Sequence, residues 1–242
     1  MTIDSELFMQ THVSVDCVIF GFDKNQLSVL VQRNTGVSND KETKLPGSLI
    51  YQKENADEVA YRVLYEQAGI DDMKLKQFKC FISLQRTANP DDADRLEDTC
   101  GNKENRLITI AYLSICKIDR ELNIFPKHKT VAWCPFDKLP QLPFDQNQIV
   151  EEALNEIRTW VEYEPSIIFE LLPNKFTASE FRRLCEAIYR KKYDARNFHK
   201  KMSRMRYLIQ LEEKQKKVPH RAGHYYRFNK VSYRKHSRIL IC

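Results

Sequence analysis

Charge is unevenly distributed along these 242 residues, and this feature most constrains the fold. Residues 166–242 contain 20 Lys and Arg against 6 Asp and Glu, a net charge of +14, whereas residues 1–165 contain 19 against 27, a net charge of −8. The contrast predicts two domains of opposite charge. A dense basic segment is typical of proteins that bind polyphosphate, because neutralised phosphates release counterions. A solvated charged face or a patch that binds anionic membranes is the other interpretation of charge alone.

The composition is that of a soluble globular protein, with 42% apolar and 30% charged residues. The chain has no run of about 18 apolar residues, and its start, MTIDSELFMQ, lacks a basic segment followed by an apolar one. We therefore expect no membrane span and no secretory signal. The seven cysteines form no CxxC pair, which argues against a disulfide framework and a structural zinc site. A reduced, cytoplasmic protein is the expectation.

The acidic part alternates between strand-like and helix-like patterns. Two β-branched runs within 13–33 flank a polar turn and predict a hairpin. From 56 to 68 apolar residues recur at helical spacing, and Gly69 supplies a stop signal. The acidic segment 88–105 lacks periodicity, which predicts a loop or a mobile insertion. Further strands are predicted at 44–50, 78–85, 107–116 and 130–136, and a second helix at 145–164. Pro165 closes that helix, and we place the boundary between domains 1–165 and 166–242 there.

The basic part has the element order of a winged helix-turn-helix domain. Thr177 and Glu180 form a predicted capping box, in which hydroxyl and carboxylate satisfy free amides at a helix start. Asp194 can cap a second helix. Each helix has an apolar stripe at helical spacing, made of Phe181, Leu184, Cys185 and Ile188 in the first and of Phe198, Met202, Met205 and Ile209 in the second. Two strand-like runs, the second at 224–231, enclose a basic turn and predict the wing.

The predicted second helix has an apolar back and a cationic front. With Phe198 and Met202 inward, Arg, Lys, Ser and Asn side chains and Tyr207 lie on or beside the outer face. The segment from Ala195 to Tyr207 contains no acidic residue. Arg and Lys can recognise guanine edges, Asn can recognise adenine, and other cations hold phosphates. The predicted DNA-binding residues are Arg196, Asn197, His199, Lys200, Lys201, Ser203 and Arg204 in the helix and Lys217, Arg221, His224 and Arg227 in the wing. A solvated or protein-binding face is the alternative.

Residues 45–70 resemble the Nudix box, whose pattern is Gly, five residues, Glu, seven residues, then Arg-Glu-U-x-Glu-Glu-x-Gly-U, where U is aliphatic. The matching positions are Leu45, Pro46, Gly47, Glu54, Arg62, Leu64, Glu66, Gly69 and Ile70. Three positions differ: Ser48 replaces the first Gly of the box, Val63 the Glu after Arg, and Gln67 the last Glu.

These differences bear on metal chemistry. In Nudix hydrolases, carboxylates of this helix hold Mg²⁺ or Mn²⁺, and such hard cations need charged oxygen ligands. Val63 has no lone pair and Gln67 has only a neutral carbonyl, which leaves one helix carboxylate, Glu66. We therefore expect no bound metal, no other cofactor and no activity on nucleoside diphosphates. We expect Glu54 and Arg62 to form a structural pair.

The whole chain resembles the Nudix-related transcriptional regulators, which include the NrtR and AraR-type groups. Besides the box, the resemblance rests on 109–115 (TIAYLSI), 176–202 and 221–228 (RAGHYYRF). It implies an α+β fold: an N-terminal Nudix-like α/β/α sandwich with a mixed sheet, then a C-terminal winged helix-turn-helix domain. It also implies a homodimer that binds palindromic operator DNA and releases it when a small effector occupies the Nudix pocket. Repression and activation both stay open.

The effectors differ between the groups: ADP-ribose in the NrtR group, which controls NAD metabolism, and L-arabinose in the AraR-type group, which controls pentose utilisation. Because the box offers few phosphate-binding residues, a neutral sugar or polyol is at least as well supported. The predicted effector contacts are Arg33, Gly47, Ser48, Glu66 and Tyr112. Arg33 and Glu66 can equally be surface charges, and Tyr112 can equally be a core residue.

Two other classes of function stay open. A metal-dependent hydrolase of nucleotide sugars could take its missing ligands from the acidic segment 91–98, and Mg²⁺-dependent hydrolysis of ADP-ribose would reveal it. An RNA-binding or scaffold protein would bind unrelated sequences with similar affinity and would have no dyad-symmetric site.

Overall fold

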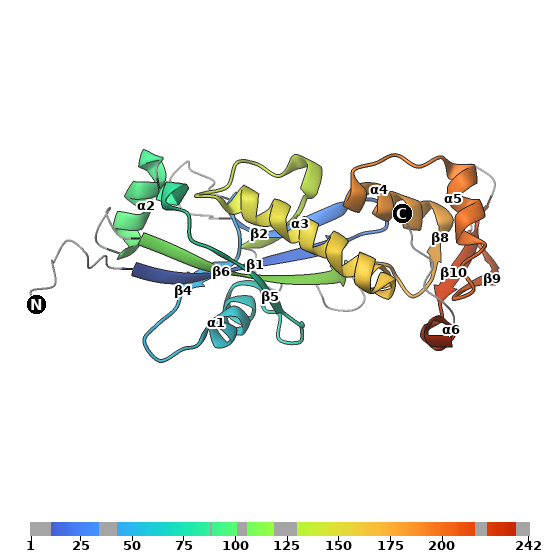
Figure 1. Cartoon of the computed structure of the whole chain (residues 1–242), viewed down its shortest axis with the longest axis horizontal. Coiled ribbons are helices and arrows are strands. Elements are labelled where there is room, and N and C mark those ends of the chain that lie inside the picture. Colours follow the sequence, from blue (N-terminus) through green and yellow to red (C-terminus); the bar gives the residue numbers. More distant parts are fainter. Residues whose placement is uncertain are drawn as a thin grey trace, which may run out of the picture.

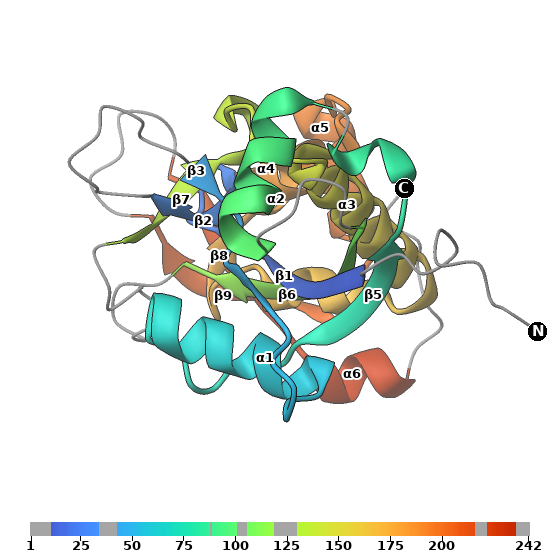
Figure 2. The ribbon, with the colours of Figure 1, turned by 90° about the vertical axis from the view of Figure 1, so that its left-hand side faces the viewer.

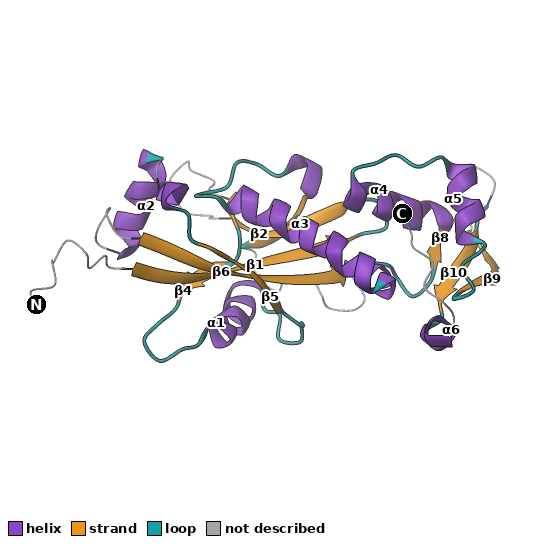
Figure 3. Cartoon of the chain, in the orientation of Figure 1, coloured by secondary structure: helices purple, strands orange, loops and turns teal. Residues whose placement is uncertain are grey.

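The structure, a computed structural model, describes residues 11–33, 43–87, 89–100, 106–118, 130–215 and 222–235. A long sheet lies between helix α1 (Ala56–Val63) and helix α3 (Gln146–Tyr163), and a second module of helices and short strands lies beyond the end of α3 (Figure 1, Figure 3). Among the helices of the described ranges, none has the length and apolar character that a bilayer span requires.

The sheet is mixed, as predicted. Strands β1 (Thr11–Phe22) and β6 (Arg106–Lys117) run parallel at its centre. The other pairs of this sheet are antiparallel, in the order β3-β2-β1-β6-β5, with β4 paired to β1 and β7 paired to β2. The remaining strands are β2 (Leu27–Arg33), β3 (Thr43–Lys44), β4 (Gly47–Leu49), β5 (Lys76–Phe81) and β7 (Val131–Pro135).

The two faces of the sheet bury different residues. In β1, Val15, Cys17 and Ile19 belong to the apolar layer under α1, whereas Val18 and Phe20 belong to the layer under α3. Successive side chains of a strand point to opposite faces, so a strand buried on both sides reads as one continuous apolar run. Figure 2 shows α1 and α3 on opposite sides of the sheet.

Helix α1 confirms the predicted helix and its stop. It begins at a capping box formed by Asn55 and Glu58 and continues as a π-helical turn, Leu64–Ala68. Gly69 follows with a φ of 66°, the left-handed conformation that glycine adopts without a Cβ penalty. This turn determines where the side chain of Gln67 points.

The loop predicted at 88–105 is wrong for residues 90–100. The chain forms a 3₁₀ turn, η3 (Leu84–Thr87), and then helix α2 (Pro90–Cys100). Pro90 can occupy the first helical position because its missing N–H has no partner there, and Asn89 accepts hydrogen bonds at the helix start. Among the described side chains of α2, Leu96 is the buried large apolar one, so no apolar stripe is visible in the sequence. Residues 101–105 lie outside the described ranges.

The second module has the winged helix arrangement. Strands β8, β9 and β10 form an antiparallel sheet in the order β8-β10-β9, and the predicted caps at Thr177 and Asp194 are confirmed. The elements in chain order are η6 (Pro165–Glu170), β8 (Phe176–Thr177), α4 (Ala178–Tyr189), α5 (Ala195–Met202), β9 (Leu208–Lys214), β10 (His224–Phe228) and α6 (Lys230–Lys235).

The predicted second helix is shorter than its apolar stripe suggested. It ends at Met202, and the chain turns before Ile209, which lies in β9. Tyr207, predicted on the outer face, is buried with 1% exposure. The helical period does not continue through these turns, so extrapolating it put Tyr207 on the wrong side.

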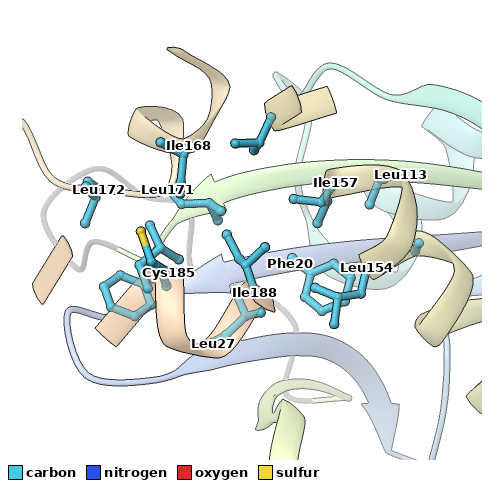
Figure 4. Packing of buried hydrophobic residues seen from close by; sticks show 14 of the residues in the cluster. Phe20, Leu27, Leu113, Leu154, Ile157, Ile168, Leu171, Leu172, Cys185 and Ile188 are labelled. Atoms are coloured by element: carbon cyan, nitrogen blue, oxygen red, sulfur yellow. The ribbon is translucent and has the colours of Figure 1, made fainter. Parts of the chain in front are cut away.

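The two modules share one apolar core. The cluster runs from Phe20 and Leu27 of the sheet to Cys185 and Ile188 of α4 (Figure 4). At its edge, Arg158 of α3 donates from Nε to the main-chain oxygen of Ile188, 2.7 Å away. The boundary at Pro165 stays a prediction; that residue is itself buried, at the start of η6.

Candidate functional site

Helix α5 lies at the end of the molecule remote from α2 (Figure 1), and it exposes a cationic surface there. Its apolar back, Phe198 and Met202, is 6% and 2% exposed. Arg196, Asn197, Lys200 and Lys201 on the helix and Arg204 on the turn after it are exposed. Within the described ranges, none of these cations forms an ion pair. The positive charge of the helix is therefore available to an anionic partner.

Other predicted DNA contacts make hydrogen bonds inside the module. His199 Nε2 lies 3.1 Å from the hydroxyl of Tyr226, which connects α5 to the wing. Ser203 Oγ donates to the oxygen of Lys200 at 3.0 Å, and His224 Nδ1 lies 3.0 Å from the oxygen of Leu211. Arg227 is exposed on β10. Lys217 and Arg221 lie outside the described residues.

A cavity of about 310 Å³ lies in the first module, on the α3 side of the sheet. Its polar wall comes from several elements: Ser14 and Asp16 of β1, Thr109 of β6 and Gln146 of α3. Lys44, Gly47 and Ser48 complete it from the segment 43–49, which contains the short strands β3 and β4 and is called the loop below. A second cavity of about 600 Å³ under α2 shares Arg86, Arg95, Pro143 and Phe144 with it. Together they form a polar cleft between the sheet and α2.

The buried cation of this cleft is already neutralised. The Arg86 side chain is 2% exposed, and its Nη2 lies 2.8 Å from Asp145 Oδ1. Its Nη1 donates to the oxygen of Phe81 at 3.0 Å. A buried ion pair with satisfied donors holds the cleft wall in place rather than attracting a further anion.

Asp16 is a buried carboxylate at the bottom of the smaller cavity. Its Oδ2 accepts a hydrogen bond from Gln146 Nε2 at 3.2 Å, and Gln146 Oε1 accepts from the N–H of Leu45 at 2.9 Å. Burial raises the pKa of Asp16 to about 6, although the nearby Arg86 guanidinium opposes the rise. A Cβ on Gly47 would lie 2.2 Å from Asp16 Oδ1, so the close approach of the loop requires glycine at this position.

We expect Asp16→Asn to stabilise the protein at neutral pH. A carboxyl whose pKa is raised by folding binds more protons in the native state, so stability falls as pH rises from about 4 to about 6. Asparagine removes that loss, about 2–3 kcal/mol above pH 6. Urea unfolding between pH 4 and 8 measures it, with exposed Asp71→Asn as the matched control. A difference from wild type that does not change with pH would contradict the assignment.

The predicted effector residues are not all brought together. Gly47 and Ser48 line the smaller cavity. Tyr112 is buried on the α1 side of the sheet, where its hydroxyl donates to Asp57. Glu66 is on the helix that covers the same side, and Arg33 is exposed at the end of β2. Neither cavity is lined by Arg33, Glu66 or Tyr112.

The sequence contained one unused signal for this site. Asp16 is an acid in the middle of an otherwise apolar strand, and buried charges in such places are rare without a specific role. Arg86 and Gln146 lie in short connections and at a helix start, where a polar residue is ordinary. No local pattern could have assigned them to a cavity.

Comparison with known families decides the assignment. A model of the NUDIX domain matches residues 10–154, which is more than half of the chain. The chain belongs to the Nudix family. A model of the NrtR DNA-binding winged helix domain matches residues 168–228, so the second module is a winged helix domain of the NrtR type.

Solved structures confirm this two-part fold. This chain shares 20% identity with Shewanella oneidensis NrtR, whose structure was solved in complex with a 27mer DNA. The two superimpose with a TM-score of 0.62 over 90% of this chain and 93% of that one. A MutT/nudix family protein from Enterococcus faecalis shares 19% identity at a TM-score of 0.60, covering 95% and 90%. No curated protein matches the sequence.

The Nudix box keeps its structural pair. Arg62 Nε lies 2.6 Å from Glu54 Oε1, and Arg62 Nη2 donates to Glu54 Oε2 at 2.9 Å. The hydrogen bonds from Arg62 lower the pKa of Glu54. The predicted pair is confirmed, and it fastens the loop before α1 to the helix.

The box residues do not fit a divalent cation. Val63 is fully buried in the apolar layer, and the Glu66 carboxylate lies 3.3 Å from Arg62 Nη1. Gln67 makes two hydrogen bonds to Gly47. Among the described residues, no group of three or more His, Cys, Asp or Glu side chains could hold a metal ion.

Proposed function

We propose that this protein is an effector-responsive transcriptional regulator. A homodimer binds operator DNA through its winged helix domains, and a small metabolite in the Nudix domain changes the affinity for DNA. The observation that carries the proposal is the unpaired cationic surface of α5, on a winged helix that shares its core with a Nudix domain. A regulator of this kind would work in the cytoplasm.

The DNA contacts would come mainly from Arg196, Asn197, Lys200 and Arg204, whose side chains are exposed. Lys201 and Arg227 suit the phosphate backbone. In a symmetric dimer the two recognition helices lie about 34 Å apart, or a multiple of that distance, so the operator should be a palindrome. His199, Ser203 and His224 would act mainly by holding α5 and the wing in shape.

The effector site that the geometry favours is the polar cleft bordered by Gly47 and Ser48. Hydroxyls, an amide and a carboxylate line it, from Ser14, Thr109, Gln146 and Asp16, and these groups suit the hydroxyls of a sugar. Arg86 and Arg95 of this cleft pair with Asp145 and Asp92, so among the described lining residues Lys44 is the one cation that remains for a diphosphate. A pentose such as L-arabinose is therefore the first candidate and ADP-ribose the second.

Helix α3 would transmit the signal. Its first residue, Gln146, hydrogen-bonds to Asp16 in the cavity, and its later turns pack on α4 of the winged helix domain. Arg158 reaches the end of α4, and Glu151 pairs with Arg190 beside it. A shift at the cavity thus has a rigid path to the DNA-binding helices.

A ligand panel tests the proposal. L-arabinose, other pentoses, hexoses and ADP-ribose are added in EDTA, and the melting temperature is measured. An effector at 100 times its dissociation constant stabilises the protein by about 2.7 kcal/mol and should also release duplex DNA. A ligand that stabilises the protein but leaves DNA affinity unchanged would contradict the regulator proposal.

Arg158→Ala should uncouple the two domains. We expect the variant to bind effector alone, and DNA alone, nearly as wild type does. A coupling of about 1–3 kcal/mol changes DNA affinity 5- to 150-fold when effector binds. In the variant this change should be at least threefold smaller. Fluorescence anisotropy with labelled duplex, with and without effector, measures it. Glu162→Ala, exposed on the same helix, is the control, and equal coupling in both variants would exclude this path.

Loss of hydrolase activity belongs to the same proposal. Without the carboxylates at positions 63 and 67 the helix lacks charged ligands for Mg²⁺. We expect no Mg²⁺-dependent conversion of ADP-ribose and water to AMP and ribose 5-phosphate. Turnover that disappears in Glu66→Ala would instead support the metal-dependent hydrolase.

A further inference from the structure

The side-chain amide of Gln67 pairs with the main chain of Gly47. Gln67 Oε1 accepts from the N–H of Gly47 at 3.2 Å, and Gln67 Nε2 donates to the oxygen of Gly47 at 2.9 Å. The side-chain amide thus makes the same pair of hydrogen bonds to Gly47 that the main chain of a neighbouring β-strand would make. It ties the π-helical turn at the end of α1 to the loop that borders the cavity.

The same loop is held from its other side. The N–H of Leu45 donates to Gln146 Oε1 at 2.9 Å, and the N–H of Cys17 donates to the oxygen of Pro46 at 2.8 Å. Gly47 itself lies against Asp16 with no room for a Cβ. Two glutamines and the β1 backbone therefore fix this wall of the cavity, and Gln67 supplies the contact from the α1 side.

A carboxylate in place of this amide would change the contact. One oxygen could still accept from the N–H of Gly47, but the other would face the main-chain oxygen of Gly47 at about the present separation, acceptor against acceptor. Such a pair is repulsive unless a proton or a cation lies between the two oxygens. Divalent Mg²⁺ and Mn²⁺ bind carbonyl and carboxylate oxygens together, and the carboxylate of Glu66 is on the adjacent residue.

We propose that Gln67 is a positioning residue that closes the contact between helix and loop without a cation, so that the shape of the cavity does not depend on divalent metals. A single change, Gln67→Glu, converts this clamp into a cation-dependent one. The inference rests on the proposed function for the role of the cavity, whereas the clamp itself is a property of the fold.

The test compares melting temperatures in EDTA and in Mn²⁺ for the full chain. Wild type should melt at the same temperature in both. Gln67→Glu should melt about 2–8 °C lower than wild type in EDTA, and Mn²⁺ should raise its melting temperature in a saturable way, with stoichiometric Mn²⁺ binding by EPR. Gln77→Glu, an exposed position on β5, carries the same charge change and should show neither effect.

A second variant tests the amide without the cation. Gln67→Met keeps the length but loses both hydrogen bonds, so its melting temperature should fall and Mn²⁺ should not restore it. Any of three results would overturn the proposal. Gln67→Met could melt at the wild-type temperature, or the melting temperature of wild type could depend on Mn²⁺. The third is that Mn²⁺ does not raise the stability of Gln67→Glu, whether or not that variant folds without the metal. These measurements involve neither DNA nor effector, so a failure of the regulator function would leave their outcome unchanged.

Discussion

Replacing both Lys200 and Arg204 by alanine is expected to weaken binding of the full chain to its preferred duplex by about tenfold to a hundredfold. Both side chains are exposed beside the buried Phe198 and Met202, and neither has an ion-pair partner among the described residues. If α5 is the recognition helix, as proposed, their removal should eliminate contacts to base edges or phosphates without disturbing the core. Fluorescence anisotropy at several salt concentrations measures the loss.

The pattern of the loss identifies the kind of contact. A loss concentrated at particular base pairs means that bases are read, whereas a uniform loss with a salt slope lower by about one per contact means that phosphates are bound. Lys53→Ala combined with Lys74→Ala removes two exposed lysines of the Nudix domain and should leave affinity nearly unchanged. Equal affinities of wild type and the Lys200/Arg204 variant would remove α5 from the interface.

Phe169→Ala should have the largest effect on stability. The ring stacks on Phe228 at 4.4 Å between centroids and 10° between planes, and it lies 5.2 Å from Phe181 and 6.1 Å from Tyr207. Truncating a buried Phe costs about 3–5 kcal/mol, because packing is lost and a cavity remains. Urea unfolding measures the loss.

The position of Phe169 gives this variant a second readout. The residue lies in η6, at the start of the winged helix domain and directly after α3, so DNA binding should fail at a lower temperature than in wild type. Tyr65→Ala, an aromatic residue 63% exposed on the Nudix side, should change stability by less than about 0.5 kcal/mol. Similar losses in the two variants would mean that the aromatic cluster does not stabilise the domain.

Most of the fold could be predicted from the sequence because its signals are local. The β-branched runs, the Gly69 stop and the caps at Thr177 and Asp194 depend on residues a few positions apart. Helix α2 escaped prediction because it buries little apolar surface. The end of α5 was predicted too late in the chain, because apolar residues in the following turns happen to continue the helical spacing.

The candidate site could be predicted only where it depends on local sequence. The cationic face of α5 follows from helical period and charge alone. The cavity instead joins Asp16, Arg86 and Gln146, which lie far apart in the chain and meet through the packing of β1, η3 and α3. The contact of Gln67 with Gly47 depends on the π-helical turn, which no pattern in the sequence predicted.

Selection of bound duplexes from a random DNA library by the full chain tests the central claim most directly. We expect one enriched, dyad-symmetric sequence whose half-sites are separated by one helical turn or a multiple of it. Its affinity should exceed that for unrelated DNA by about a thousandfold or more, and the Lys200/Arg204 variant should lose this preference. Recovery of unrelated sequences with equal affinity would contradict the account.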